Sequence, residues 1–469
     1  QIRNLGLETP AQALYTVPGV DVLQKDERVF RLGMRGFNGL YNNRVLTLLD
    51  GNVVTDASPA EAPPWQMLPV HVLDIERMEV VRGPTSTLYG ANAFSGVVSI
   101  RAKRPLNHPG VEAELAGLLH ALPDLPDDVA GSSIREYTVE GYAAFGWVND
   151  AERFGLRVST LFGQPPQALF HNGLEESQSP LRKLGGRLAL DLHTRGKGQI
   201  ELDLTAVKQE GPEQFFEHSW QPIREEYASR ASFSARKLWG GPLDLKLLMT
   251  GRALEHSDVL GFAFVEGLDF TELVDKKNLR GSGSAQLDLT LMDERLRVST
   301  ALEGVTEQTL YGSDGEVLRR YLGFMIDGEI RLGRQRRWML GAGLRSEGVL
   351  VDSSRFQRIT YQNLNWRSSL VYRLSDNQDL RTSISSAYRT PTSLQSVTGV
   401  GLPDDGEAVP VRWWVARPDL EPENMVSAEL GYRGEFATGW KVRATAYMAR
   451  MSGLIDVVVK ETWPLYFAD

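Results

Sequence analysis

Apolar and polar residues alternate along most of the chain after residue 105. In Gln199–Ala206 the apolar Ile200, Leu202 and Leu204 alternate with polar neighbours, and Leu243–Leu247 repeats the pattern. Successive side chains of a strand point to opposite faces, so this period of two predicts β-strands with one apolar and one polar face. Such segments follow one another almost to the end of the chain, with almost no helical stretch between them.

Two architectures fit strands of this kind. A soluble antiparallel sheet with one wet face shows the same alternation, whereas a membrane barrel adds long strands and aromatic residues at the strand ends. The segments are long, no apolar run approaches the ~18 residues of a membrane helix, and tryptophans lie near segment ends or turns, at Trp147, Trp239, Trp338, Trp366 and Trp440. We therefore predict a mainly β fold, a transmembrane antiparallel β-barrel.

The connections between the segments are uneven in length. Short turns are predicted at Gly185-Gly186, Gly196-Lys197-Gly198 and Leu374–Asn377, and long loops at Ala121–Gly131, Pro165–Pro180 and Thr390–Pro410. Short turns on one side and long loops on the other are typical of membrane barrels.

The first hundred residues follow a different pattern of short elements. Met78–Val81 is a β-prone run, and Arg82-Gly83-Pro84 then turns the chain, because proline cannot continue a strand ladder. Thr85–Tyr89 can form one helical turn, with a threonine or serine as N-cap and Gly90 as its end, and Val97–Ile100 returns as a strand. These residues predict a compact strand–turn–strand element.

Composition and charge exclude several classes of function. The chain has 51 basic and 60 acidic residues, which gives a net charge of −9 and argues against a nucleic-acid binder. It has no cysteine, which excludes disulfides and thiolate chemistry. The sequence holds no catalytic signature, and its 7 histidines are scattered, so we expect no enzyme, no resident cofactor and no metal site. Acidic clusters at Asp124–Asp128 and Glu175-Glu176 are solvated loops or, alternatively, loop Ca²⁺ sites.

Two stretches near residue 100 carry a family resemblance. Ile75–Pro84 reads I-E-R-M-E-V-V-R-G-P and Leu88–Ile100 reads L-Y-G-A-N-A-F-S-G-V-V-S-I. Together they resemble the plug-domain signature of TonB-dependent outer-membrane receptors. Val17-Pro18-Gly19, Arg35-Gly36-Phe37 and a hairpin turn at Asp50-Gly51 precede them in the order that the family has.

Two later motifs resemble the barrel of the same family. Ser386–Thr392 reads S-A-Y-R-T-P-T, and Arg417–Glu423 reads R-P-D-L-E-P-E, followed by A-E-L-G-Y. Arg417 stands where the family usually has asparagine. The resemblance therefore implies a small mixed α/β plug domain over residues 1–104, folded in the lumen of a barrel that occupies residues 105–469.

The resemblance also implies that the chain is incomplete at both ends. We expect about 16 of about 22 barrel strands to be present, with the barrel truncated before closure. The family carries a TonB-binding box ahead of the first plug helix, and we expect that box to lie upstream of Gln1.

The function implied is import of a scarce ligand, such as a siderophore–iron complex, haem or cobalamin, across the outer membrane of a Gram-negative bacterium. The implied partners are TonB with ExbB and ExbD, outer-membrane lipid and the small-molecule or metal-chelate ligand, with no nucleic acid, and the receptor is expected to be a monomer. Two alternatives remain: a signalling or docking receptor of the same fold without transport, and a soluble β-rich carbohydrate-binding protein or enzyme.

The site residues implied by the resemblance form two groups. Arg35 and Arg82 match the plug arginines that relatives place against barrel glutamates. Glu429 matches one such glutamate and is the expected partner of Arg82, and a second glutamate would lie beyond residue 469. The alternative is that these are ordinary surface ions, worth under ~1 kcal/mol each. The remaining plug-motif residues are Gly36, Phe37, Asp50, Gly51, Glu76, Glu79, Gly83, Pro84, Tyr89, Gly90 and Gly96.

Overall fold

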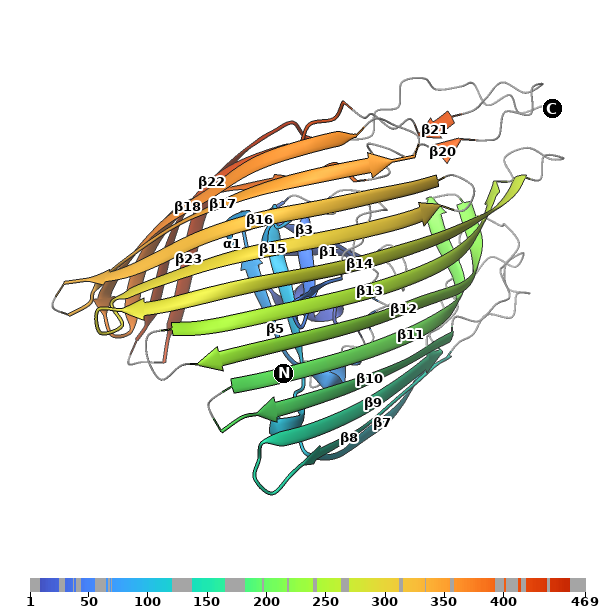
Figure 1. Ribbon diagram of the computed structural model, residues 1–469, viewed down its shortest axis with the longest axis horizontal. Helices are drawn as coiled ribbons and strands as arrows, with labels where there is room; N and C mark the ends of the chain where they lie inside the picture. The colour runs from blue at the N-terminus through green and yellow to red at the C-terminus, as the bar shows by residue number, and fades with distance from the viewer. Residues whose placement is uncertain are drawn as a thin grey trace.

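The computed structural model of the chain describes most of the plug and of the barrel wall (Figure 1). The described residues are 9–24, 30–36, 38, 44–54, 65, 68, 70–119, 137–164, 182–195, 198–216, 219–238, 243–262, 270–311, 315–333, 335–354, 358–392, 400–401, 412–414, 419–436 and 439–455.

A small sheet of four strands forms the centre of the plug, in the order β4-β3-β6-β5. β3 (Val45–Leu49) pairs in parallel with β6 (Gly96–Ala102), whereas β4 (Asn52–Val53) and β5 (Ile75–Arg82) are antiparallel to their neighbours. All five residues of β3 are buried, as a strand covered on both faces requires. The hairpin predicted at Asp50-Gly51 is confirmed.

The remaining plug elements pack against this sheet. They are the 3₁₀ helices η2 (Gln12–Thr16) and η4 (Val72–Asp74), and the strands β1 (Val20–Gln24) and β2 (Phe30–Met34), which form a separate antiparallel pair. Their apolar side chains join those of the four-stranded sheet in one core, which includes Leu14, Phe30, Leu32, Trp65, Val98 and Ile100. The plug therefore has a hydrophobic core of its own.

The predicted strand–turn–strand element folds as the sequence indicates. β5 and β6 are antiparallel, and α1 (Ser86–Tyr89) makes the single helical turn between them, which ends at Gly90. Thr85 occupies the N-cap position, but its side chain makes no capping hydrogen bond. The backbone N–H of Gly83 donates instead to the Ser95 carbonyl at 2.8 Å, which closes the elbow across its base.

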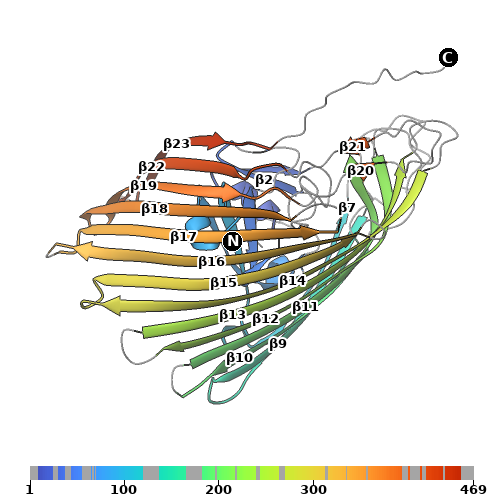
Figure 2. The same cartoon turned by 45° about the horizontal axis from the view of Figure 1, so that its top comes forward.

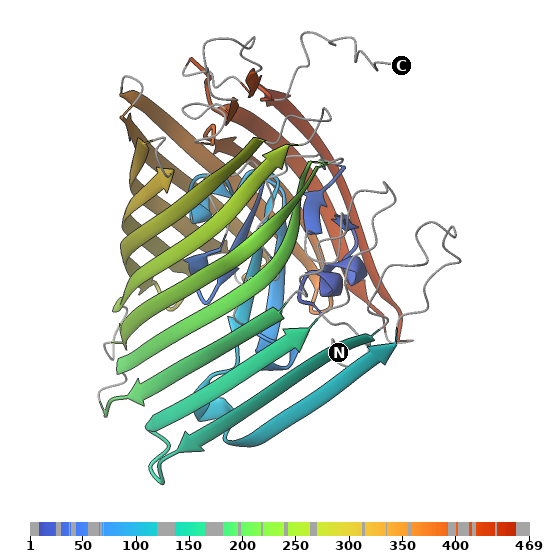
Figure 3. The ribbon, with the colours of Figure 1, turned by 90° about the vertical axis from the view of Figure 1, so that its right-hand side faces the viewer.

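The wall is one antiparallel sheet of 15 strands in which each strand pairs with the next along the chain. Figures 1 and 3 show this sheet curving around the plug. Its strands are β7 (Gly110–Leu119), β8 (Tyr137–Val148), β9 (Phe154–Gln164), β10 (Arg182–His193), β11 (Gly198–Phe216), β12 (Ser219–Leu238), β13 (Leu243–Phe262), β14 (Phe270–Leu291), β15 (Leu296–Tyr311), β16 (Gly315–Leu332), β17 (Trp338–Ser353), β18 (Ile359–Ser375), β19 (Gln378–Arg389), β22 (Glu423–Glu435) and β23 (Lys441–Ser452).

The two strands missing from that series, β20 (Val400–Gly401) and β21 (Arg412–Trp414), form a separate small hairpin. It lies beside one end of the wall (Figure 2). The predicted fold class, a plug domain within an antiparallel β-barrel wall, is thus confirmed. The 15 paired strands are close to the about 16 expected.

Short turns join the strands at one end of the wall, including the predicted turn at Asp376-Asn377 between β18 and β19. Gly196 and Lys197, of the turn predicted before β11, lie outside the described residues. The turn predicted at Gly185-Gly186 is wrong, because both glycines lie inside β10 and pair with β9 and β11. A Cβ added at Gly185 would lie 3.1 Å from the Leu161 side chain, so a close neighbour accounts for a glycine there. No helix among the described residues is long and apolar enough to cross a membrane.

The two faces of the wall differ as the alternation predicts. Leu115, Leu184 and Met448 are 61–76% exposed on the outer face, whereas Arg157 and Arg187 are buried on the face toward the plug. Trp147, Trp338 and Trp440 lie near short turns, as expected of strand-end aromatics. Trp366 instead lies in the middle of β18, and Trp239 lies outside the described residues.

Candidate functional site

A buried carboxylate, Asp74 at the end of η4, joins the plug to the first strands of the wall. Its side chain is 1% exposed and accepts hydrogen bonds from four wall side chains. The donors are Tyr142 Oη (2.9 Å), Arg157 Nε (2.8 Å), Ser159 Oγ (3.0 Å) and Arg187 Nη1 (3.2 Å). Because all four belong to β8, β9 and β10, one plug residue ties three wall strands together.

Arg187 extends this cluster along the plug. Its guanidinium lies 2.5 Å from an Asp203 carboxylate oxygen and 3.8 Å from one of Asp50, and it donates to the Lys103 carbonyl at 2.9 Å. Arg104, just after the plug sheet, pairs with Asp191 and lies 3.4 Å from Asp203. The predicted motif residue Asp50 therefore lies within a network of alternating charges.

Two plug groups in this region have shifted pKa values. Burial raises the pKa of the Asp50 carboxyl to about 6, although the nearby Arg187 charge opposes the shift. Burial lowers the pKa of His71 to about 4, helped by the Lys183 charge and opposed by Asp74. The His71 ring stacks on the Tyr142 ring with centroids 4.9 Å apart, so neutral histidine forms part of the contact.

A second junction has the opposite arrangement of charges. Glu423, at the start of β22, is fully buried and accepts two hydrogen bonds from the plug residue Arg44, at 3.0 and 2.8 Å. Arg389 of β19 donates to the same carboxylate at 2.7 Å, and the backbone N–H of Ile455 at 2.8 Å. Such paired, multiply bonded carboxylates are the form in which buried charges are tolerated.

Two of the three predicted lock residues, Arg35 and Glu429, are brought together. Arg35 forms an ion pair and a hydrogen bond with Glu429 of β22. Its guanidinium also lies over the Tyr447 ring, 4.5 Å from the centroid, and Tyr447 Oη donates to the Arg35 carbonyl at 3.4 Å. A cation–π contact of this kind adds to the ion pair.

Arg82 is not brought to Glu429. It is exposed on β5 and donates to the Pro18 carbonyl at 2.5 Å, within the plug. The expectation that Arg82 pairs with Glu429 is therefore corrected, because Arg35 occupies that carboxylate. Whether either arginine acts as a lock stays a prediction.

Two motif glycines make room for arginines at the interface. Gly83 has φ +100°, and a Cβ there would lie 2.8 Å from Arg35 Nη1. Gly90 has φ +80°, and a Cβ there would lie 2.8 Å from Nη2 of Arg345 on the wall. Both positions combine a backbone conformation that favours glycine with a side chain in close approach.

Arg345 is itself held in place by wall carboxylates. It lies 2.8 Å from Glu347 and 2.7 Å from Glu303, and Tyr388 donates to the other oxygen of Glu347. The tip of α1 therefore rests on a prearranged group of charges rather than on an apolar surface.

The other motif residues serve within the plug. Gly36 N–H donates to Asp21 at 3.2 Å, a Cβ on Gly51 would touch Leu248 of the wall, and a Cβ on Gly96 would overlap the Met34 sulfur. Pro84 is buried. Glu76 and Glu79 are exposed, and Glu79 pairs with Arg77 at 3.1 Å rather than with the wall. Burial and the Glu79 charge raise the pKa of Tyr89, and Phe37 lies outside the described residues.

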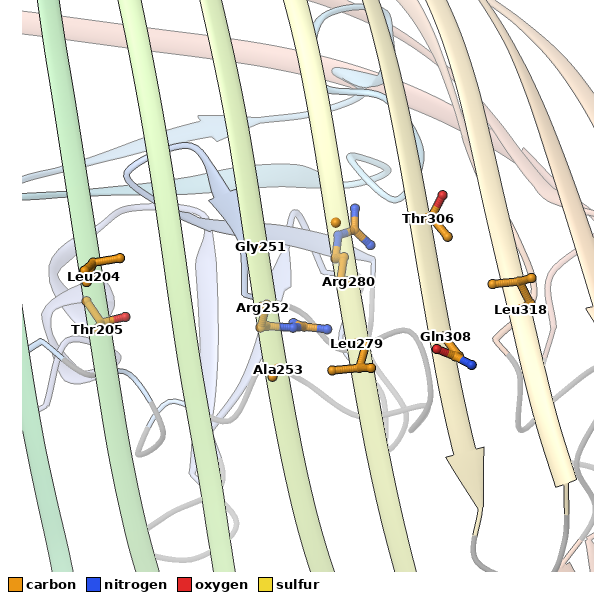
Figure 4. A pocket seen from close by; sticks show the side chains of 11 residues that line it. Leu204, Thr205, Gly251, Arg252, Ala253, Leu279, Arg280, Thr306, Gln308 and Leu318 are labelled. Carbon is orange, nitrogen blue, oxygen red and sulfur yellow. The ribbon is translucent and has the colours of Figure 1, made fainter.

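A shallow hollow of about 670 Å³ lies in the wall across β11 and β13–β16 (Figure 4). Cross-strand pairing puts Leu204, Gly251, Gly281 and Thr306 on one face. That face is opposite to Arg252, which donates to the plug carbonyl of Val53 at 3.5 Å. The hollow therefore opens mainly on the outer side of the wall, away from the plug.

No group of three or more histidines or carboxylates within the described ranges could hold a metal ion. The acidic clusters weighed as loop Ca²⁺ sites, at Asp124–Asp128 and Glu175-Glu176, lie outside those ranges.

Sequence reasoning missed most of the junction residues. Asp74 directly precedes the signature stretch, and Arg389 and Glu423 lie within the two barrel motifs. The motifs could therefore have indicated these three residues as candidates. Arg157 and Arg187 carry no motif at all, and only the register of β9 and β10 brings them to Asp74.

Comparison with known proteins matches both parts of the chain. A model described as "TonB-dependent Receptor Plug Domain" matches residues 1–97, and one described as "TonB dependent receptor-like, beta-barrel" matches residues 136–466. The vitamin B12 transporter BtuB of Vibrio vulnificus strain CMCP6 is 24% identical over 468 residues, which cover 96% of this chain and 66% of the relative. The strain YJ016 protein is 23% identical, over 79% of this chain and 60% of the relative.

Solved structures share the fold at low identity. The unliganded ferric citrate transporter FecA superposes with a TM-score of 0.73 at 16% identity, covering 95% of this chain and 68% of its own. The alcaligin receptor FauA from Bordetella pertussis gives a TM-score of 0.69 at 15% identity, covering 99% and 71%. The chain thus spans about two thirds or less of the length of the B12 transporters that it matches.

Proposed function

The chain belongs to the TonB-dependent receptor family, and from that premise we propose that it imports a scarce ligand across the outer membrane of a Gram-negative bacterium by TonB-driven rearrangement of its plug. The ligand class is a metal chelate or cobalamin-like molecule. This class is consistent with relatives named for vitamin B12, and with structural neighbours named for ferric citrate and alcaligin.

The observation that supports transport is the kind of contact that holds the plug. An apolar interface would hold a permanently fixed plug more stably, because buried ion pairs stabilise a fold only weakly relative to well-packed apolar groups. Here the described contacts around Asp74, Glu423 and Glu429 are charged and hydrogen-bonded. Such groups can exchange protein partners for water. The apolar cluster described between plug and wall is small, with Phe94 packed on Ala387 and Met425, so we expect the plug to leave the wall without exposing a large apolar surface.

The two junctions would respond differently to a pull. The Asp74 cluster lies beside the chain segment that connects β6 to β7, and its arginines also bond to backbone carbonyls of Lys103 and His108. Arg35 and Arg44 precede the plug sheet and bind Glu429 and Glu423 through their side chains, and the contact that the wall makes with the Arg35 backbone, from Tyr447 Oη, is a longer one of 3.4 Å. We expect the second junction to open first and the first to act as the hinge.

The partners follow from the same proposal. TonB, energised by ExbB and ExbD, would act on the N-terminal side of the plug, and outer-membrane lipid would cover the leucine-rich outer face of the wall. The receptor would act as a monomer without a resident cofactor.

The test is energy-dependent uptake. Cells that lack their own receptors would express the full-length protein with and without functional TonB, and uptake of labelled cyanocobalamin and of ferric siderophores would be measured. We expect accumulation of one ligand only when TonB is present. Binding without accumulation in TonB-positive cells would contradict import and favour a docking receptor.

A charge swap tests the lock separately. Arg35→Glu should raise pore conductance in planar bilayers, and adding Glu429→Arg should restore low conductance, because the ion pair is rebuilt with reversed polarity. Arg77→Glu is the matched control, since Arg77 is exposed and its described ion pair is with Glu79 on the same plug strand. Equal conductance for Arg35→Glu and Arg77→Glu would refute the lock.

A further inference from the structure

One buried arginine on the inner face of the wall has no counter-charge within hydrogen-bond reach among the described residues. Arg319 of β16 is 2% exposed. Its Nη2 donates to the Pro391 carbonyl at 2.7 Å and its Nη1 to Tyr321 Oη at 3.5 Å, both neutral acceptors. Its Nε–H has no hydrogen-bond partner in the described part of the chain. A buried guanidinium without a carboxylate is costly, because its charge is compensated only by neutral dipoles.

The nearest carboxylate in register is already occupied. Glu307 of β15 lies directly opposite Arg319 in the strand pairing. Its two oxygens are held by Arg252 at 3.4 Å and by Arg280 at 3.1 Å. Arg252, Arg280, Glu307 and Arg319 lie opposite one another across β13–β16. Arginines therefore outnumber carboxylates in this described row of inner-face residues. Arg252 and Arg280 are seen on adjacent strands in Figure 4.

Two further unpaired donors belong to residues adjacent to the hydrogen-bond partners of Arg319. Tyr361 of β18 packs in one cluster with Tyr321 and Val351, and its hydroxyl is buried without a hydrogen-bond partner among the described residues. Thr390, which precedes the Pro391 carbonyl bound to Arg319, is 1% exposed, and its hydroxyl likewise lacks a described partner. Buried hydroxyls normally find partners, so a group of unpaired donors around a guanidinium calls for an explanation.

We propose that Arg319, Tyr361 and Thr390 form an oxyanion subsite that takes a carboxylate or phosphate group of the imported ligand. The proposal rests on the import function above and assigns the ligand a negatively charged oxygen group. Arg319 supplies the charge and the planar donor fork, and the two hydroxyls supply neutral donors.

The Pro391 carbonyl occupies the guanidinium in this structure. A ligand oxyanion is a stronger acceptor than a neutral carbonyl, because it sets a full negative charge against the guanidinium and can accept two of its N–H groups at once. The ligand therefore displaces the carbonyl, and Thr390–Thr392 moves off Arg319 as the oxyanion enters. Ligand binding is in this way coupled to a shift at the end of β19.

Removing the unpaired hydroxyls gives variants in which an effect on ligand binding can be told apart from an effect on folding. Tyr361→Phe and Thr390→Val keep size and remove only hydroxyls that make no hydrogen bond to the described residues. A purely structural role predicts unchanged or higher thermal stability and unchanged anion binding. Tyr372→Phe is the matched control on the same strand, since Tyr372 lies against Trp338 with ring centroids 4.2 Å apart, far along β18 from the subsite.

The experiment titrates inorganic phosphate and citrate, at constant ionic strength, into the detergent-purified full-length receptor and follows binding by calorimetry. We expect one anion to bind, with citrate indicating a carboxylate group and phosphate a phosphate group. Tyr361→Phe and Thr390→Val should each weaken that binding about tenfold, with Tyr372→Phe unchanged.

Absence of binding by both anions, or equal binding by all four proteins, would overturn the subsite. The import function is judged independently, by uptake. TonB-dependent uptake that is unaffected by Tyr361→Phe and Thr390→Val would overturn the subsite and leave import standing. Uptake that does not depend on TonB would overturn TonB-driven import, and the anion titration would still decide the subsite.

Discussion

Asp74→Asn is the sharpest perturbation of the plug–wall junction. The substitution keeps the shape of the side chain and removes its charge. It also replaces one acceptor oxygen by an NH₂ group, which then faces donors from the wall, since Ser159 and Arg187 both donate to the same Asp74 oxygen. The variant therefore loses two ion pairs, with Arg157 and Arg187, and gains a donor–donor conflict.

The loss of stability in Asp74→Asn depends on the ion pairs that Arg157 and Arg187 retain. Breaking a buried ion pair by removing one partner typically costs about 3–5 kcal/mol. Arg187 retains Asp203 at 2.5 Å and Arg157 retains Glu112 at 3.2 Å, so neither is left alone. We therefore expect the lower end of the range, about 3 kcal/mol, or roughly a 150-fold rise in the open population of the junction.

Hydrogen exchange of the receptor in detergent measures this population directly, through the peptides that contain β5 and β6. Glu79→Gln is the matched control, because Glu79 lies on β5 and its described ion pair is with Arg77 at the surface. An exposed pair of this kind contributes under ~1 kcal/mol. If Asp74→Asn exchanged at the same rate as Glu79→Gln, the Asp74 cluster would not anchor the plug, and the cost assigned to its buried charge would be refuted.

Three further changes probe other contacts. Glu423→Gln should increase pore conductance in planar bilayers, because Arg44 and Arg389 lose their shared carboxylate; unchanged conductance would contradict that junction. Gly90→Ala should lower the thermal midpoint by a few degrees, since its Cβ meets Arg345 at 2.8 Å at positive φ; an unchanged midpoint would contradict the close contact. His71, with a folded pKa of about 4, contributes stability above its unfolded pKa of 6.5 that is lost as pH falls towards 4. Acidification from pH 7 to 5 should therefore remove a His71 contribution of about 2 kcal/mol, measured as the difference in urea unfolding between the wild type and His71→Phe, because Asp50, with a pKa raised to about 6, contributes in the opposite sense in both proteins.

The sequence predicted the parts of the fold that depend on local patterns, such as alternation and turn residues. Alternation placed the strands of the wall, because a strand with one lipid-facing side must alternate. Asp50-Gly51 placed a hairpin, and Gly90 ended a helical turn. The rule failed at Gly185-Gly186, where a paired glycine usually marks a turn, but here the Leu161 side chain needs the space inside the strand.

The site was less readable, because its contacts depend on register. Asp74 is separated from its four wall partners by 68 to 113 residues. Alternation shows that Arg157 and Arg187 share the inner face, but which residue of one strand lies opposite which of the next is set by turns and neighbours along the whole sheet. The Arg35–Glu429 pair was found only through the family resemblance, and Arg82 shows the limit of that route.

The two junctions differ in whether the wall or the plug supplies the arginines, and this difference follows the path of the chain. Where the chain passes from the plug to the wall, the wall supplies arginines, which bond to plug carboxylates and to the backbone of the connecting segment at once. At β22 the plug supplies the arginines, and the wall supplies carboxylates that contact only their side chains. A displacement of the N-terminal part of the plug breaks the second set one side chain at a time, whereas the first set must yield together with the connecting backbone. We therefore expect the order of opening to follow which partner contributes the guanidinium group, and exchanging polarity at one junction should change that order.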